Sequence, residues 1–243
     1  MSNEDEVVRD LTIPERALVV VAHPDDIDFG MAGTIATLTR AGAEVSYCLV
    51  TSGEAGPPDD ADRDELRTRR EAEQRSAASV VGVHDVRFLG YPDGRVESSL
   101  ALRRDISRVI RDVRPDLVIA QGSDRDWDRM YYSHPDHLAV GEATVSAVYP
   151  DSRNRWSHIE LLDEGFEPHA VARMWLHGLE PNLFIDITDV IDLKVRALLS
   201  HESQVGARDG ITDLIRNWGA NNADLAGWPA GRFAEGFREI DTR

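Results

Sequence analysis

Short apolar runs alternate with segments of helical periodicity along the first two thirds of the chain. The run from Ala17 to Ala22 is continuous and rich in valine, which is typical of a parallel strand buried on both faces. Further strands are predicted over 44–51, 86–89 and 116–121, and helices over 31–40, 62–81, 99–113 and 133–148. This order predicts an α/β fold: a Rossmann-like, doubly wound and mostly parallel sheet flanked by helices.

The last third of the chain has a weaker pattern. Strands are expected over 170–176 and 183–187 and a helix over 190–200, whereas residues 205–243 follow no readable pattern and their role stays open. The sequence contains no internal repeat, no low-complexity segment and no convincing linker. We therefore expect a single domain over 1–243, with residues 1–14 as a loosely ordered tail.

The composition narrows the classes of partner. Asp and Glu number 44 against 27 Lys and Arg, a formal net charge of −17, which argues against nucleic acid or an anionic membrane as partner. The single cysteine, Cys48, excludes an intrachain disulfide. The chain has no apolar stretch long enough to cross a membrane, and its first residues are acidic rather than signal-like. The expected protein is cytoplasmic, without membrane insertion, and compatible with a homo-oligomer.

Two clusters of metal-ligating residue types follow predicted strands. His23-Pro24-Asp25-Asp26 comes directly after the first strand, and His134-Pro135-Asp136-His137 follows the loop after the strand at 116–121. In open α/β sheets, ligands bind just beyond the carboxyl ends of the strands. Imidazole and carboxylate groups suit zinc, iron or manganese, and catalytic zinc usually takes three protein ligands and leaves one position open for water.

Spacing alone leaves the roles within each cluster open. One aspartate of the first cluster can ligate a metal while the other holds the attacking water, which would combine a lowered water pKa with a general base. In the second cluster, Ser133 is expected to cap a helix that carries His134 and His137 about one turn apart on one face. One of these histidines could then bind the metal while the other faces the substrate.

Each cluster also has a simpler interpretation, as a strand-ending turn or as a capped helix start. Their joint occurrence at strand ends favours metal-assisted hydrolysis. An Fe(II) oxygenase is a second interpretation, because His23-x-Asp25 with a distant histidine imitates its ligand triad, although such sites usually lie in double-sheet barrels. A third is a non-catalytic α/β ligand-binding module, although the chain has no glycine-rich nucleotide-binding motif.

Several segments occur in the order seen in one known family. They are Ala22–Asp26 (AHPDD), Thr51–Gly56 (TSGEAG), Arg70–Glu73, Phe88–Gly94, His134–His137 (HPDH) and His201–Gln204. Over residues 15 to 205 the chain resembles the PIG-L/LmbE-like N-deacetylases. That family includes the GlcNAc-PI de-N-acetylases and the deacetylases of mycothiol and bacillithiol synthesis. The combination of motifs is specific, although the single pieces are not.

The resemblance implies a role for each residue of the two clusters. His23, Asp26 and His137 would ligate zinc, although the same set can hold Fe²⁺ or Mn²⁺. Asp25 would be the general base. His134 would stabilise the oxyanion or protonate the leaving amine, and Asp136 would orient a histidine.

The reaction implied is hydrolysis of a linear N-acyl amide, expected to be the N-acetyl group of a small amino-sugar-type substrate. A larger amide conjugate is the alternative within the same family. Asp93 matches a family position near the sugar, and Arg70 and Glu54 are further candidates for substrate contacts. Each of these three residues also has a simpler interpretation. Asp93 could be an ordinary turn aspartate, Arg70 could lie on a solvated helix face, and Glu54 could belong to a solvated loop.

Overall fold

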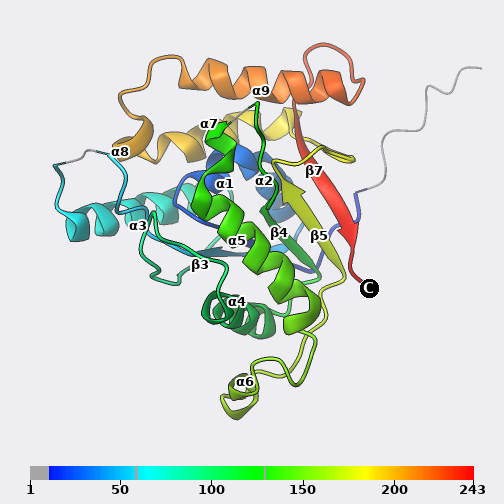
Figure 1. Ribbon diagram of the computed structural model, residues 1–243. Helices are drawn as coiled ribbons and strands as arrows, with labels where there is room; N and C mark the ends of the chain where they lie inside the picture. Colours follow the sequence, from blue (N-terminus) through cyan, green and yellow to red (C-terminus); the bar gives the residue numbers. More distant parts are fainter. Residues whose placement is uncertain (1–10, 58–59, 129) are drawn as a thin grey trace, which may run out of the picture.

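The computed structural model describes residues 11–57, 60–128 and 130–243 (Figure 1). Most of the expected tail at 1–14 therefore lies outside the described residues. The described chain forms one seven-stranded sheet in the order β3-β2-β1-β4-β5-β7-β6. The strands are β1 Arg16–Val21, β2 Glu44–Leu49, β3 Asp85–Phe88, β4 Leu117–Gln121, β5 Arg173–His177, β6 Leu183–Asp186 and β7 Ala234–Asp241.

The five strands β1 to β5 pair in parallel, and β7 runs antiparallel between β5 and β6. The central strand β1 shows why its sequence is an uninterrupted apolar run. Val19 and Val21 enter the core on one face of the sheet while Leu18 and Val20 enter the core on the other, and all four are fully buried. The predicted doubly wound, mostly parallel α/β fold is confirmed.

Helices cover both faces of the sheet (Figure 1). One core contains residues of α1, α2, α3, α7 and α9, and the other contains residues of α4 and α5. The helices are α1 Asp26–Gly30, α2 Ala32–Arg40, α3 Arg63–Val80, α4 Leu100–Val113, α5 Pro135–Ser146, α6 Glu160–Asp163, α7 Ile191–Leu199, α8 Glu202–Val205 and α9 Ile211–Leu225. Short helical turns η1 Met130–Ser133, η2 Ala147–Asp151 and η3 Thr188–Val190 join them.

The strand order reverses at β1. From β1 the chain moves outward to β2 and β3, and it then returns to place β4 on the other side of β1. Such a switch point leaves a crevice at the carboxyl ends of the two central strands, because the following loops diverge to opposite sides. The first histidine cluster follows β1 and the second follows β4, so the topology brings both clusters to this crevice.

Two features differ from the pattern expected of the sequence. Residues 26–30 form the short helix α1 ahead of α2, and the break falls at Met31, whose φ is −146°. Helix α9 and strand β7 occupy the region without a readable pattern. Strand β7 carries the charged residue Glu235 at a buried position, where an apolar residue would be expected, because its carboxylate forms an ion pair with Lys194.

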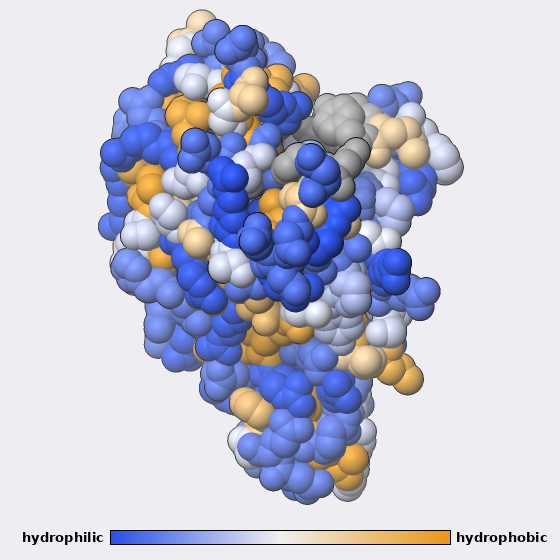
Figure 2. Space-filling view, turned by 90° about the vertical axis from the view of Figure 1, so that its left-hand side faces the viewer, coloured by the Kyte–Doolittle hydropathy of each residue, from blue (hydrophilic) through white to orange (hydrophobic). Residues whose placement is uncertain are grey.

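The surface seen in Figure 2 is largely hydrophilic. The face that Figure 2 presents, on the left-hand side of Figure 1, is dominated by hydrophilic residues, and apolar residues form small separate groups on it. Within the described ranges, none of the helices combines the length and the apolar character that crossing a membrane requires.

Candidate active site

The turn after β1 holds Asp25 in an unusual backbone conformation. Asp25 has φ 83° and ψ −24°, in the left-handed region that a residue with a side chain adopts at a cost of about 1–2 kcal/mol. Its carbonyl oxygen accepts the backbone N–H groups of Asp28 and Phe29 at 2.9 and 3.0 Å, which starts α1. The turn therefore directs the side chains of Asp25 and Asp26 in different directions.

Helix α3 braces this turn from behind. Gln74 Oε1 accepts the backbone N–H of Asp25 at 2.9 Å. The Arg70 guanidinium donates to the carbonyl oxygens of Pro24 at 2.8 Å and Gly53 at 2.7 Å, and it lies 3.3 Å from Oδ2 of Asp25. Arg70 and Gln74 are both almost completely buried. Arg70 therefore lies behind Asp25, within the protein, rather than in the cavity where a substrate contact was expected.

Three of the predicted ligands converge in one place. His23 Nδ1 lies 3.2 Å from His137 Nε2 and 3.5 Å from Asp26 Oδ2, and His137 Nε2 lies 3.0 Å from Asp26 Oδ1. In a tetrahedral site with zinc bonds of about 2.0–2.1 Å, two ligand atoms lie about 3.3 Å apart. The two histidine nitrogens lie close to this spacing, and each of them faces a different oxygen of the Asp26 carboxylate. The donor set of two imidazoles and one carboxylate suits a divalent metal ion.

The other nitrogen of His23 faces two carboxylates. Nε2 lies 3.1 Å from Asp93 Oδ1 and 3.2 Å from Asp136 Oδ2. The backbone N–H groups of Gly94 and Val96 donate to the Asp136 carboxylate at 2.8 and 3.2 Å. Burial alone would lower the pKa of His23, but its hydrogen bonds to Asp136, Asp26 and Asp93 raise it well above the usual value. A proton on Nε2 leaves the Nδ1 lone pair for a metal.

Two alternative ligand triads also include His23: His23 with His134 and His137, and His23 with Asp93 and Asp136. In the second, the carboxylates meet Nε2 and are also hydrogen-bonded to backbone N–H groups, which is typical of groups that orient a ligand. In the first, no carboxylate contributes. The triad of His23, Asp26 and His137 joins two imidazoles and a carboxylate, with one oxygen of Asp26 3.5 Å from His23 Nδ1 and the other 3.0 Å from His137 Nε2.

Asp25 is set apart from these ligand contacts but lines the same cavity as Asp26 and His137. Burial raises the pKa of Asp25 to about 6, and the Arg70 guanidinium limits the rise. Burial would also raise the pKa of Asp26, but His137 holds it well below the usual value. The two neighbouring carboxyl groups therefore differ in acidity, as expected for one base and one ligand.

His134 caps helix α5. Its Nδ1 accepts the backbone N–H of Asp136 at 3.2 Å, so the expectation that Ser133 caps this helix was wrong. Ser133 ends η1, and its hydroxyl accepts the backbone N–H of Asp126 instead. The ring of His134 lies with its centroid 4.9 Å from that of His23. Burial and the neighbouring His23 lower the pKa of His134.

Glu54 and Asp93, two predicted substrate contacts, lie against each other. Glu54 Oε1 accepts the backbone N–H of Asp93 at 3.2 Å. Both Asp93 carboxylate oxygens have partners, since Oδ2 accepts the backbone N–H of Ala55 at 2.8 Å while Oδ1 faces His23. The buried Oε2 of Glu54 has no hydrogen-bond partner among the described residues.

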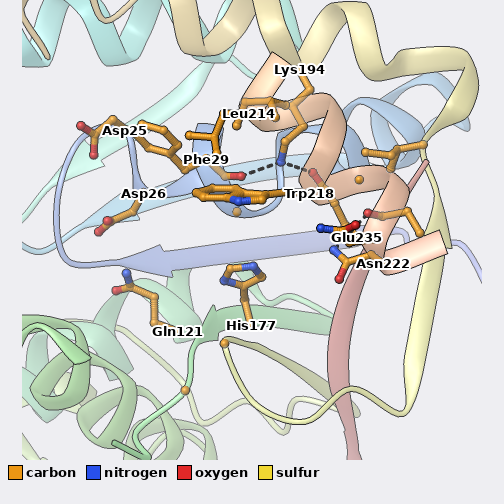
Figure 3. A pocket seen from close by; sticks show the side chains of 18 of the residues that line it. Asp25, Asp26, Phe29, Gln121, His177, Lys194, Leu214, Trp218, Asn222 and Glu235 are labelled. Atoms are coloured by element: carbon orange, nitrogen blue, oxygen red, sulfur yellow. Dashed lines mark hydrogen bonds and ion pairs between the residues drawn. The ribbon is translucent and has the colours of Figure 1, made fainter. Parts of the chain in front are cut away.

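A cavity of about 780 Å³ opens beside the candidate ligands, and its lining includes residues without any sequence motif (Figure 3). His177 ends β5 and is the clearest of these. Burial, and then Lys194, lower the pKa of His177 to about 4, so its imidazole is neutral at neutral pH. A Cβ atom at Gly30 would lie 2.9 Å from Cε1 of His177, so glycine allows α1 to approach this ring. In the sequence, the feature that could have indicated a role for His177 is its position at the end of a predicted strand.

The far wall of the cavity is held by a buried ion pair. Lys194 of α7 lies 2.5 Å from Glu235 of β7 and donates to the carbonyl oxygen of Phe29 at 2.7 Å. Glu235 also accepts the backbone N–H groups of Gly33 and Thr34 at the start of α2. This network fixes α1, α2, α7 and β7 around the cavity.

A comparison of the chain with protein-family models identifies its family. The family model for PIG-L, described as GlcNAc-PI de-N-acetylase, matches residues 18–148, which is more than half of the chain and includes both clusters. The chain belongs to the PIG-L family. The PIG-L resemblance read from the motifs is thereby confirmed.

Two similar proteins are named as deacetylases. The chain is 32% identical to the diacetylchitobiose deacetylase of Thermococcus kodakarensis, with 93% of this chain and 83% of the relative covered. It is 30% identical to a probable N-acetyl-α-D-glucosaminyl L-malate deacetylase 2 of Bacillus anthracis, with 87% and 90% covered. Both relatives are named as deacetylases of N-acetylated amino-sugar compounds, as expected from the motifs.

A solved structure extends the PIG-L comparison to the whole fold. The N,N′-diacetylchitobiose deacetylase of Pyrococcus horikoshii, solved with its inhibitor MPG, superposes with a TM-score of 0.88 at 29% identity. The match covers 98% of this chain and 88% of the other. The described strands form one open sheet, whereas an Fe(II) oxygenase would be expected to have a double-sheet barrel.

Proposed function

We propose that the protein is a zinc-dependent deacetylase that hydrolyses the acetamido group of a small amino-sugar compound. The observation that carries the proposal is the convergence of His23, Asp26 and His137 at 3.0–3.5 Å, with the Asp25 carboxyl group left over beside them. Family membership and the deacetylase names of the relatives support the same reaction class.

His23, Asp26 and His137 would hold the metal. When bound, zinc would lower the pKa of a coordinated water and polarise the acyl carbonyl. Two imidazoles and one carboxylate are also suitable for Fe²⁺ or Mn²⁺, so zinc is the proposal and the other two are the alternatives. The hydrogen bonds from Asp93 and Asp136 would keep the His23 ring in the orientation that ligation needs.

Asp25 would be the general base. A carboxyl group with a pKa near 6 is ionised at neutral pH and still basic enough to take a proton from the attacking water. Arg70 keeps the carboxylate ionised and holds its orientation from behind. We therefore assign Arg70 a positioning role on Asp25 instead of a contact to the substrate. The proton that Asp25 accepts can pass to the departing amine.

His134 would stabilise the oxyanion. Because its Nδ1 accepts the N–H of Asp136, the neutral ring carries its proton on Nε2 and can donate a hydrogen bond. Its lowered pKa keeps the ring neutral at neutral pH, which suits a hydrogen-bond donor better than a proton source for the amine. Asp136 would orient both histidines, His23 through its carboxylate and His134 through its backbone.

Glu54 and Asp93 receive different roles in this proposal. Both oxygens of Asp93 are engaged, so we assign it mainly to the orientation of His23. We retain Glu54 as a candidate contact to a sugar hydroxyl because it follows β2, although its Oε1 accepts the backbone N–H of Asp93 and its Oε2 is buried.

The test combines metal analysis of the purified protein with acetate release from a panel of N-acetylated amino sugars. We expect zinc in the protein and acetate release from at least one of these substrates. A panel of larger amide conjugates of the same sugars separates the alternative substrate class. Bound metal without any amide hydrolysis would contradict the proposal, and so would full activity in protein stripped of metal.

A further inference from the structure

The segment His201–Gln204 lies outside the cavity. His201 directly precedes helix α8, and neither it nor α8 contributes to the cavity lining. Its side chain is fully buried, and its Nε2 lies 2.8 Å from Oδ2 of Asp28 on α1, a residue 173 positions earlier in the chain. A buried histidine therefore contacts the short helix that carries Asp26.

Stability alone does not explain a histidine–aspartate pair at this place. His201 and Asp28 are both fully buried, and His201 Nδ1 and Asp28 Oδ1 have no hydrogen-bond partner among the residues that the structure describes. Burying charged groups costs solvation free energy, and apolar residues of similar volume often stabilise a core equally well. Each unpaired buried polar atom adds to that cost. The pair is better explained by the position that it gives to Asp28.

Gln74 connects Asp28 to the turn of the proposed base. The Oδ2 atom of Asp28 accepts hydrogen bonds from His201 Nε2 at 2.8 Å and from Gln74 Nε2 at 3.0 Å. Because a carboxylate oxygen only accepts hydrogen bonds, it selects the NH₂ end of the Gln74 amide. The carbonyl end of the amide faces the other way and accepts the backbone N–H of Asp25 at 2.9 Å. Three hydrogen bonds therefore lead from His201 to Asp25.

The backbone of Asp25 depends on such support. Its φ of 83° lies in the left-handed region, which a residue with a side chain keeps only where the surrounding structure holds it. The direction of the Asp25 carboxyl group follows from this backbone conformation. A displacement of about 1 Å at a catalytic group can cost about a hundredfold in rate. A change at His201 should therefore reach the base without a contact to metal or substrate.

Helix α8 is itself fixed against α3. Glu73 accepts the backbone N–H of Ser203 at 2.8 Å through Oε1 and the Ser203 hydroxyl at 2.5 Å through Oε2. Glu73 directly precedes Gln74 in α3, so the same turn of α3 holds α8 on one side and the turn at Asp25 on the other. The position of the His201 ring is thereby fixed as well.

We propose that His201 is a positioning residue that holds Asp25 in the conformation that directs its carboxylate at the attacking water. It acts through the hydrogen bonds of Asp28 and Gln74. This inference rests on the proposed deacetylase function, in which Asp25 is the base. His201 thus affects the chemical step and not the binding of metal or substrate.

The kinetic test uses the full chain loaded with zinc and an N-acetylated amino sugar that the parent hydrolyses. His201→Leu removes the donor to Asp28 and keeps an apolar side chain of similar volume. We expect kcat to fall at least about tenfold, with KM changed less than about threefold and the zinc content unchanged. His201→Gln, whose amide can donate to Asp28, should restore part of kcat. His158→Asn removes the contact with Asp151, a histidine–aspartate pair outside the cavity, and is the control that should keep the parental kcat.

A double-mutant cycle tests the route through Gln74. When His201→Leu is added to Gln74→Met, kcat should fall less than about threefold further, because the two residues act through one chain of hydrogen bonds. Ser203→Ala removes the hydroxyl that holds α8 to Glu73 and leaves the core filled. This milder variant should lower kcat by about twofold to fivefold at an unchanged KM.

Amide hydrogen exchange of the zinc-loaded protein without substrate gives a readout that does not depend on turnover. The N–H of Asp25, which Gln74 protects, should exchange at least about tenfold faster in His201→Leu protein than in the parent. The N–H groups of Val19 and Val20 in β1 should keep their parental rates, because the effect is local.

Three results would overturn the proposal: parental kcat in His201→Leu protein, loss of its zinc, or fully additive losses in the cycle. An equal rise in exchange at Asp25 and along β1 would do the same, because it would show a general loss of stability. If the parent hydrolyses none of the amides, the proposed function fails, and the exchange at Asp25 shows separately whether His201 holds the turn.

Discussion

Gln74 of α3 accepts the backbone N–H of Asp25 through Oε1 at 2.9 Å, and its Nε2 donates to Asp28 Oδ2 at 3.0 Å. One buried amide therefore joins both sides of the turn that carries the proposed base. The turn has a left-handed residue at Asp25, so it depends on surrounding contacts to keep its shape. Gln74 therefore holds the turn that positions Asp25, although it does not line the cavity.

The first prediction concerns this amide. Gln74→Met removes both hydrogen bonds while keeping an apolar body of similar length, and it leaves the Asp25 N–H without its acceptor. We expect a loss of about 1–3 kcal/mol in the free energy of unfolding and a lower kcat. Urea unfolding and acetate release measure the two effects. Gln204→Met, on the half-buried helix α8, is the control and should be close to the parent. A fully active and equally stable Gln74→Met protein would contradict the bracing role.

The second prediction separates base from ligands. Asp25→Asn keeps the shape of the side chain but removes its basicity, so we expect bound metal to be retained and kcat to fall by about 10²–10⁴-fold. Metal analysis and kinetics with one substrate, both on the same preparation, measure the metal content and kcat. Asp213→Asn, an exposed change on α9, serves as the control. Parental activity in Asp25→Asn protein would refute the base assignment.

The third prediction follows from the pKa of the same group. Asp25 must be ionised to accept a proton, so activity should be lost as pH falls through its pKa. Burial raises that pKa to about 6, and the positive charge of a bound metal acts in the opposite direction. We therefore expect the acid limb of kcat/KM to lie at or below about pH 6. A limb centred above pH 7, or the same limb in the residual activity of Asp25→Asn protein, would assign the titration to another group.

The fourth prediction concerns the carboxylate behind His23. Asp136→Asn weakens the hydrogen bond to Nε2 of His23, which fixes the ring for ligation. Loss of such a partner typically costs about 10–100-fold in metal affinity. Titration of the stripped protein with zinc against a chelator measures this loss. Asp25→Asn protein should show no comparable change, so equal metal affinities in the two variants would contradict the division of roles.

The fifth prediction is a pH dependence of stability. Burial would lower the pKa of His201, but Asp28, 2.8 Å from its Nε2, raises it above the ordinary value of 6.5. The stabilisation from this pair is present in full below pH 6.5 and is lost as pH rises through the raised pKa of the folded protein. The free energy of unfolding of the metal-free parent should therefore fall more between about pH 6 and pH 9 than that of His201→Gln. Parallel losses in the two proteins would exclude His201 as the cause.

The sequence could predict the part of the fold in which local patterns agree with tertiary structure. The valine-rich run of β1 is apolar because both of its faces are buried, and His23 and Asp26 are recognisable because they directly follow that run. The α9 region could not be predicted in the same way. Gly219, Asn221 and Asn222 interrupt its helical pattern, and Glu235 in β7 is buried only because Lys194 comes from another element.

The same limit applies to the site. The position of the two clusters after predicted strands indicated that they share one edge of the sheet. It could not show that Arg70 lies behind Asp25 or that His134 itself caps α5. His177 and Trp218 have no motif around them, and only the packing of β5 and α9 brings them into the cavity. The sequence could therefore indicate the candidate metal ligands, whereas the rest of the cavity lining depends on tertiary packing.

The central claim is that His23, Asp26 and His137 hold one metal ion. Metal analysis of the parent beside His137→Ala and His134→Ala tests it most directly, because His134 caps α5 and His137 lies in its first turn, yet their proposed roles differ. We expect about one metal ion per chain in the parent and in His134→Ala, and almost none in His137→Ala. A His137→Ala protein that keeps its metal, or a His134→Ala protein that loses it, would contradict the account.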